Sequence, residues 1–60
     1  MRANYELEAL RAMRRYGWRS KTFATAYAIA RHYDGLSHDG AIRAAKRAPG
    51  VRASDVPFGI

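Results

Sequence analysis

The sequence contains no cysteine and only two prolines. Without cysteine no disulfide can stabilise the fold, and zinc sites built on thiolates are excluded. The absence also fits a reducing compartment, so we expect a cytoplasmic protein. Long apolar runs are missing as well. Because a membrane-spanning helix needs about 20 consecutive apolar residues, we expect no membrane partner.

Acidic residues are scarce, since five Asp and Glu stand against eleven Lys and Arg in 60 residues. The formal net charge is +6 and the isoelectric point is about 10.6. An excess of this size in so short a chain is the electrostatic footprint of a nucleic-acid binder. It predicts a polyanionic or acidic partner and says nothing directly about the fold.

The sequence also lacks the patterns of an enzyme. It has no glycine-rich phosphate loop, no cysteine nucleophile, and no carboxylate pair arranged with a base. A folded chain of this length buries only about 60% of the surface that it exposes when unfolded, so it rarely encloses a substrate. We therefore expect a protein that is not an enzyme and that uses no cofactor.

Histidines and carboxylates gather around one turn, at His32, Asp34, His38 and Asp39. These residue types are reasonable ligands for a divalent metal, but their spacing matches no strong metal motif. Asp34 and Asp39 are explained more simply as a turn residue and a helix-start residue. The sequence therefore predicts no metal site.

Apolar periodicity and capping residues predict an all-α fold: one small three-helix domain with helices over about residues 5–16, 21–33 and 37–48. Asn4 is the candidate N-cap of the first helix and Gly17 its stop. Ser20 or Thr22 caps the second helix, and Ser37 caps the third. The middle helix is expected to be central.

Helical spacing assigns an inner face to each helix. All four tyrosines fall on inward positions, so we expect them in the core rather than stacked on bases. On the second helix Ala24 and Ala28 lie opposite the large apolar residues and would let another backbone come close. The predicted inner faces are Tyr5, Ala9, Ala12, Met13 and Tyr16; then Phe23, Ala26, Tyr27, Ile29, Ala30 and Tyr33; and then Ala41, Ala44, Ala45 and Ala48.

The last ten residues, 51–60, form a C-terminal tail that cannot continue as a regular helix past Pro57. Val56, Phe58 and Ile60 alternate with polar or small residues, which predicts an extended segment. A single short strand has no ladder partner here. The tail therefore docks on the helices or on a partner, and the small core favours internal docking.

The second and third predicted helices are joined by Asp34, Gly35 and Leu36, a short glycine-bearing turn of the kind found in a helix-turn-helix. In that arrangement the third helix would present five residues to a DNA groove: Ser37, His38, Arg43, Lys46 and Arg47. Arg11, Arg14 and Arg15 are secondary candidates. Arg31 argues against the motif, because a small residue is usual where the two helices approach. A solvated surface is the simpler explanation for any of these cations.

The leading hypothesis is a small basic DNA-binding protein, a transcription regulator or accessory factor. Because one module makes few base contacts, a homodimer with two third helices one DNA turn apart is favoured. Trp18, Val56, Phe58 and Ile60 are the candidates for self-association or partner binding. The alternative is an adaptor or inhibitor, for example a phage-encoded one, that docks its basic face on an acidic protein surface. Trp18 or Phe58 would then serve as the apolar anchor.

Overall fold

The computed structural model describes residues 4–60, and three α-helices dominate this part of the chain. Helix α1 spans Tyr5–Tyr16, α2 spans Lys21–His32 and α3 spans His38–Lys46. A single 3-10 turn, η1, follows at Ala53–Asp55. Residues 4–60 contain no strand, so the predicted all-α class is confirmed. No helix in this range is both long and apolar enough to cross a membrane.

Each helix begins at a polar residue whose side chain accepts a hydrogen bond from a backbone N–H three residues later. The acceptors are Asn4, Ser20 and Ser37, with donor-to-acceptor distances of 3.1, 3.1 and 3.2 Å. These bonds satisfy N–H groups that the first turn of a helix leaves without partners. Ser20, rather than Thr22, is therefore the cap of α2.

Helix α1 ends at Gly17, whose φ of 71° lies in the left-handed region that glycine adopts at little cost. The N–H groups of Gly17 and Trp18 both point back to the carbonyl oxygen of Met13, and the Trp18 bond measures 3.0 Å. This turn sends the Trp18 side chain into the core, where it is buried. Trp18 therefore has a structural role in the core, although the sequence analysis named it as a candidate for partner binding.

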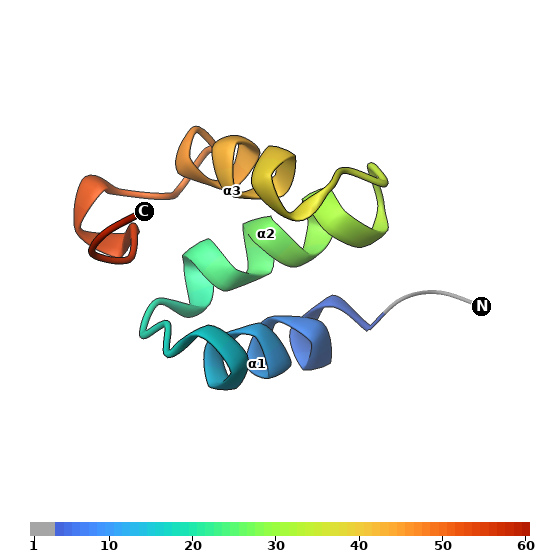
Figure 1. Cartoon of the computed structure of the whole chain (residues 1–60), viewed down its shortest axis with the longest axis horizontal. Helices are drawn as coiled ribbons and strands as arrows, with labels where there is room; N and C mark the ends of the chain where they lie inside the picture. The colour runs from blue at the N-terminus through green and yellow to red at the C-terminus, as the bar shows by residue number, and fades with distance from the viewer. Residues whose placement is uncertain (1–3) are drawn as a thin grey trace.

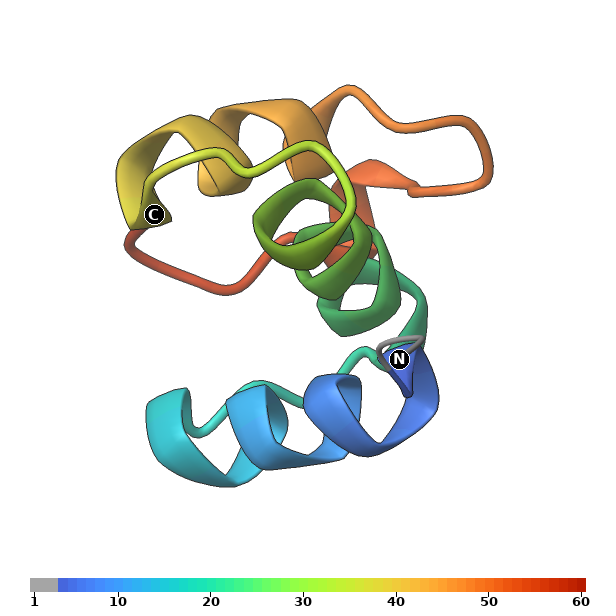
Figure 2. The same ribbon diagram turned by 90° about the vertical axis from the view of Figure 1, so that its right-hand side faces the viewer.

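The helices form three layers, with α2 between α1 and α3 (Figure 1). Seen along α2, the other two helices lie on its opposite sides (Figure 2). Ala24 and Ala28 of α2 are buried, and so is Ala9 of α1. Because these side chains are small, backbones can approach closely, as predicted for Ala24 and Ala28. Ala41 and Ala45 supply the buried face of α3.

The large side chains of the core form one aromatic cluster. The Trp18 ring lies 5.0 Å from Phe23, 4.9 Å from Tyr27 and 4.8 Å from Tyr16, measured between centroids. Phe23 and Tyr27 meet Trp18 edge to face, an arrangement that aromatic pairs favour. The cluster joins the end of α1 to the middle of α2.

The predicted burial of all four tyrosines is wrong. Tyr27 is buried and Tyr5 is half-buried, but Tyr16 is 39% exposed and Tyr33 is 76% exposed. Tyr33 follows the last residue of α2, where the chain turns away and nothing covers the ring. Ile29, also assigned to the inner face, is 39% exposed. Helical spacing placed Ile29 and Tyr33 on the same broad face as Tyr27. In the structure α1 and α3 cover only part of that face.

The tail also differs from its predicted extended form. A 3-10 turn interrupts it at Ala53–Asp55, and the Asp55 carboxylate accepts a 2.9 Å hydrogen bond from the backbone N–H of Arg52. Val51 and Val56 pack against the core, whereas Phe58 is fully exposed. The chain turns again after Pro57, where the N–H of Ile60 donates to the Pro57 carbonyl oxygen at 3.3 Å and Gly59 has a φ of 90°, so the alternating residues do not form an extended segment.

Candidate nucleic-acid interface

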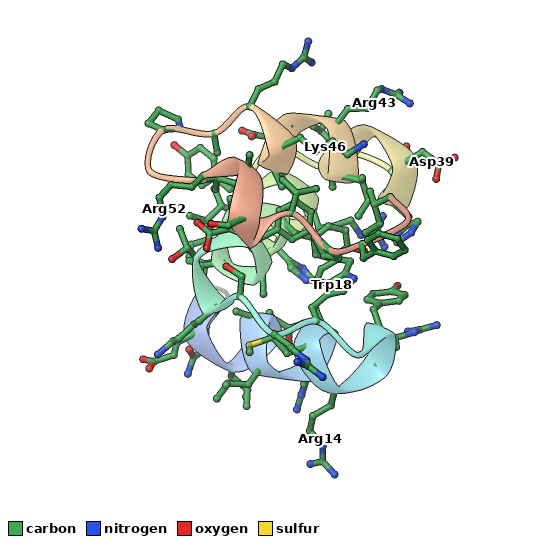
Figure 3. All side chains as sticks on the ribbon, turned by 90° about the vertical axis from the view of Figure 1, so that its left-hand side faces the viewer. Arg14, Trp18, Asp39, Arg43, Lys46 and Arg52 are labelled. Carbon is green, nitrogen blue, oxygen red and sulfur yellow. The ribbon has the colours of Figure 1, made fainter. Side chains whose placement is uncertain are left out.

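The outer face of α3 carries three exposed cations: Arg43, Lys46 and Arg47. Ala41 and Ala45 occupy the opposite, buried side, so helical spacing turns the cations outward. Figure 3 shows Arg43 and Lys46 on the outer side of the fold. None of the three forms an ion pair with any residue in the range 4–60. We call these three residues the α3 cluster.

Asp39 lies one turn before Arg43 and projects from the same end of the molecule (Figure 3). A carboxylate in the first turn stabilises a helix, because it faces the positive end of the helix dipole. The same charge would repel a phosphate. The cationic character of α3 is therefore concentrated in its last turn and the residue beyond it.

Two of the predicted contact residues on α3 already have partners within the fold. The Ser37 hydroxyl accepts the capping bond from Gly40. The Nδ1 atom of His38 lies 2.8 Å from the Tyr27 hydroxyl, and its ring lies 5.1 Å from the Tyr16 ring. His38 is half-buried as a result. Both residues help to hold α3 in place.

The three arginines of α1 divide between different surroundings. Arg11 forms a 3.0 Å ion pair with Glu8. The Arg15 guanidinium lies 5.6 Å from the centre of the Tyr16 ring. Arg14 extends from α1 away from the other two helices (Figure 3). The secondary contacts predicted from sequence therefore do not form one surface.

A shallow hollow lies between α1 and α2, and it brings Arg11 and Arg15 together with Arg31 of α2. The sequence analysis counted Arg31 only as an obstacle to a helix-turn-helix. In the structure its side chain is exposed, and Nη1 donates a 3.0 Å hydrogen bond to the Leu36 carbonyl oxygen. The long side chain of Arg31 thus extends away from the contact between α2 and α3. Its position beside α1 depends on packing that no local pattern reveals.

The chain segment that joins α2 to α3 comprises residues 33–37. Gly35 has a φ of 70°, and the N–H of Leu36 donates to the carbonyl oxygen of Ala30 at 3.0 Å. This bond and the one from Arg31 pin the turn to the end of α2. Use of α2 and α3 as a helix-turn-helix stays a prediction.

The predicted association residues differ in how much of their surface is free. Trp18 is buried in the aromatic cluster, and Val56 is half-buried. Ile60 is partly exposed, and the side chain of Phe58 is fully exposed. Of these four residues, Phe58 is therefore the most exposed.

No group of three or more His, Asp or Glu side chains in residues 4–60 is close enough to hold a metal ion. Nε2 of His32 lies instead 3.2 Å from one carboxylate oxygen of Glu8, and the other oxygen of Glu8 is paired with Arg11.

Comparison with models of protein families, with characterised proteins and with solved structures found no match for this chain. The function is therefore inferred from the residues and their geometry.

Proposed function

We propose that the protein binds duplex DNA through α3, as a regulator or accessory factor. The observation that supports this most is the α3 cluster: three exposed cations, without ion-pair partners in residues 4–60, on the outer face of one helix. Cations held free of internal partners can neutralise phosphates and release counterions. The net charge of +6 would steer the encounter.

The dimensions of α3 suit a major groove. An α-helix with its side chains is about 10–12 Å in diameter, which fits a major groove about 12 Å wide. The nine residues of α3 extend for about 14 Å at about 1.5 Å per residue. Arg43 and Arg47 lie one turn apart and can reach the same strand. Arginine at a base edge can donate two hydrogen bonds to guanine, whereas Lys46 is suited to a phosphate.

Two copies would be needed for tight and specific binding, because one short helix makes few base contacts. A dimer would place two α3 helices about 34 Å apart, one turn of DNA. The exposed Phe58 ring is the apolar group best placed to join the copies. Light scattering on the purified protein measures this directly.

The test is fluorescence anisotropy with a labelled random-sequence duplex across a salt series. On a random-sequence duplex the arginines have no fixed base partner, so all three cations are expected to contact phosphates. The triple variant Arg43→Gln, Lys46→Gln, Arg47→Gln should then reduce the slope of log K against log salt by about 2.7, since each lost phosphate contact removes about 0.9. The matched control is Arg14→Gln, Arg19→Gln, Arg52→Gln, which removes the same charge from other exposed sites. Equal losses in both variants would show general attraction without an interface on α3. No binding by the wild type at low salt would reject the proposal.

The alternative function, docking on an acidic protein, is favoured by one observation. Phe58 is fully exposed beside a strongly basic domain, and an aromatic side chain of this kind can anchor an interface whose charges steer association. This alternative predicts no binding to duplex DNA. It also predicts that Phe58→Ala abolishes binding to the acidic partner, while charge changes on α3 mainly slow association.

A further inference from the structure

The hollow between α1 and α2 has a volume of about 330 Å³. Its floor includes the small side chains of Ala12 and Ala28, both buried. The charged groups at its rim are three arginines, one histidine and one carboxylate: Arg11, Arg15, Arg31, His32 and Glu8. The hollow is therefore cationic at neutral pH even without a charge on the histidine.

The single carboxylate lies at one end of the hollow and has its own partners. Glu8 accepts from Arg11 at 3.0 Å, and its other oxygen lies 3.2 Å from Nε2 of His32. These contacts compensate the negative charge of Glu8 locally. The remaining two arginines that line the hollow, Arg15 and Arg31, have no carboxylate partner in residues 4–60.

Arg15 and Arg31 provide the positive charge of the hollow that Glu8 does not compensate. Neither forms an ion pair within residues 4–60. Arg31 uses one N–H on the Leu36 carbonyl, and a guanidinium carries five N–H donors, so most of its donors stay free. Two guanidinium groups on facing helices form a pair of donors suited to the oxygens of a phosphate.

The two tyrosines that line the hollow, Tyr16 and Tyr27, add no negative charge to it. Burial, together with the nearby Tyr16 hydroxyl, raises the pKa of Tyr27 to about 12, while Arg31 and Arg15 oppose the rise. Burial outweighs the effect of the two guanidinium charges on the pKa of Tyr27. The phenol of Tyr27 therefore stays neutral at pH 7 beside the two arginines.

Tyr16 and Tyr27 also connect the hollow to the start of α3. The Tyr27 hydroxyl lies 2.8 Å from Nδ1 of His38, the first residue of α3, and the Tyr16 ring is next to the His38 ring. A group bound between Arg15 and Arg31 would thus lie beside the helix that carries the α3 cluster. A duplex in contact with α3 presents a line of phosphates along each strand, and these are available to cations next to α3.

We infer that Arg15 and Arg31 bind a backbone phosphate of the same nucleic acid that α3 contacts. This inference rests on the proposed function. It gives the protein a second point of attachment, which fixes the angle at which α3 enters the groove. Contacts to phosphate position a protein on DNA, whereas contacts to base edges read the sequence.

The test is the salt dependence of duplex binding by the double variant Arg15→Gln, Arg31→Gln. Loss of one phosphate contact is expected to reduce the slope of log K against log salt by about 0.9. Arg14→Gln, Arg52→Gln is the matched control, because both arginines are exposed, lie outside the hollow and remove the same charge. The control should leave the slope within about 0.3 of the wild type, consistent with general charge loss alone.

Arg31 also holds the turn before α3, so its replacement could disturb the fold. Arg15→Gln alone avoids this difficulty, because Arg15 donates no hydrogen bond within residues 4–60. A shallower slope for Arg15→Gln, with an unchanged unfolding midpoint, supports the inference. Wild-type slopes in both Arg15→Gln and the double variant overturn it while leaving the proposed function intact.

Inorganic phosphate separates a failed site from a failed function. In a ¹H–¹⁵N NMR titration against chloride at equal ionic strength, phosphate should shift the Nε–H signals of Arg15 and Arg31 and leave that of Arg14 in place. If the wild type binds no duplex, the proposed function fails, and localised phosphate shifts then assign the site to a phosphate from another source. Absence of these shifts overturns the site itself.

Discussion

The Tyr27 hydroxyl lies 2.8 Å from Nδ1 of His38, so a partly buried hydrogen bond joins the middle of α2 to the first residue of α3. Tyr27 is only 6% exposed, and its ring also packs edge to face on Trp18. The pair therefore connects the aromatic core with the surface that we propose for DNA. It sets where α3 begins relative to α2.

Replacing Tyr27 with phenylalanine should lower the free energy of unfolding by about 1 kcal/mol, because a hydrogen bond is lost and Nδ1 of His38 is left without its partner. Urea denaturation at pH 7 measures the change. Tyr33→Phe is the control, since Tyr33 is 76% exposed and should change stability very little. Equal effects of the two substitutions would contradict the role given to the Tyr27 hydroxyl.

Tyr27 also predicts how stability changes in alkali. Its pKa is raised from 10.0 to about 12 in the folded protein, chiefly by burial. The unfolded chain therefore loses the phenolic proton first, and the stabilisation present below pH 10 disappears as the pH rises toward about 12. Wild type should lose stability more steeply than Tyr27→Phe over this window. Parallel curves for the two proteins in denaturation at stepped pH would count against the prediction.

Phe23 should be the most sensitive core position, because it is the largest side chain with no exposed surface. Phe23→Ala is expected to cost about 3–5 kcal/mol, which is enough to unfold a domain of this size. Phe58→Ala changes the same residue type at a fully exposed position and should stay within about 0.5 kcal/mol of the wild type. Thermal unfolding followed by circular dichroism compares the two. A stable, cooperative Phe23→Ala protein would show that the packing described for the core is wrong.

Gly17→Ala should destabilise the protein by about 1 kcal/mol, since a φ of 71° is unfavourable for a residue with a Cβ atom. No atom lies within 4 Å of a Cβ built at Gly17, so the cost is one of backbone conformation and not of crowding. Gly17→Asn should be milder because asparagine tolerates the left-handed region better. Unfolding midpoints of the two variants should therefore differ in that order, and the reverse order would refute the explanation.

Asp55→Asn should loosen the tail. The backbone N–H of Arg52 lowers the pKa of the Asp55 carboxyl, so the ionised carboxylate supports the 3-10 turn. This support is present above the ordinary value of 3.8 and is lost as the pH falls through the lowered folded value. A lower protection factor against hydrogen exchange at the Arg52 amide is the expected result, both in the variant and in the wild type at low pH. The exposed Asp34→Asn serves as control and should leave this amide unchanged.

The helix ends could be predicted because they depend on neighbouring residues. Asn4 and Ser37 cap the first turns that follow them, and Gly17 ends α1 through its own φ angle. These interactions span three or four residues, so local sequence contains the information. The exposed cations of α3 follow in the same way from helical spacing against Ala41 and Ala45.

The tertiary structure alone decided which predicted inner residues became core. Helical spacing assigns Tyr27 and Tyr33 to the same broad inner face, yet Tyr27 is buried, whereas Tyr33 lies just past the end of α2 and is 76% exposed. Arg15 and Arg31 belong to different helices and meet at one hollow because the alanines of α1 and α2 let those helices approach. Burial and the meeting of distant side chains depend on where helices cross, and a period of 3.6 residues gives the direction of a side chain but not what lies opposite it.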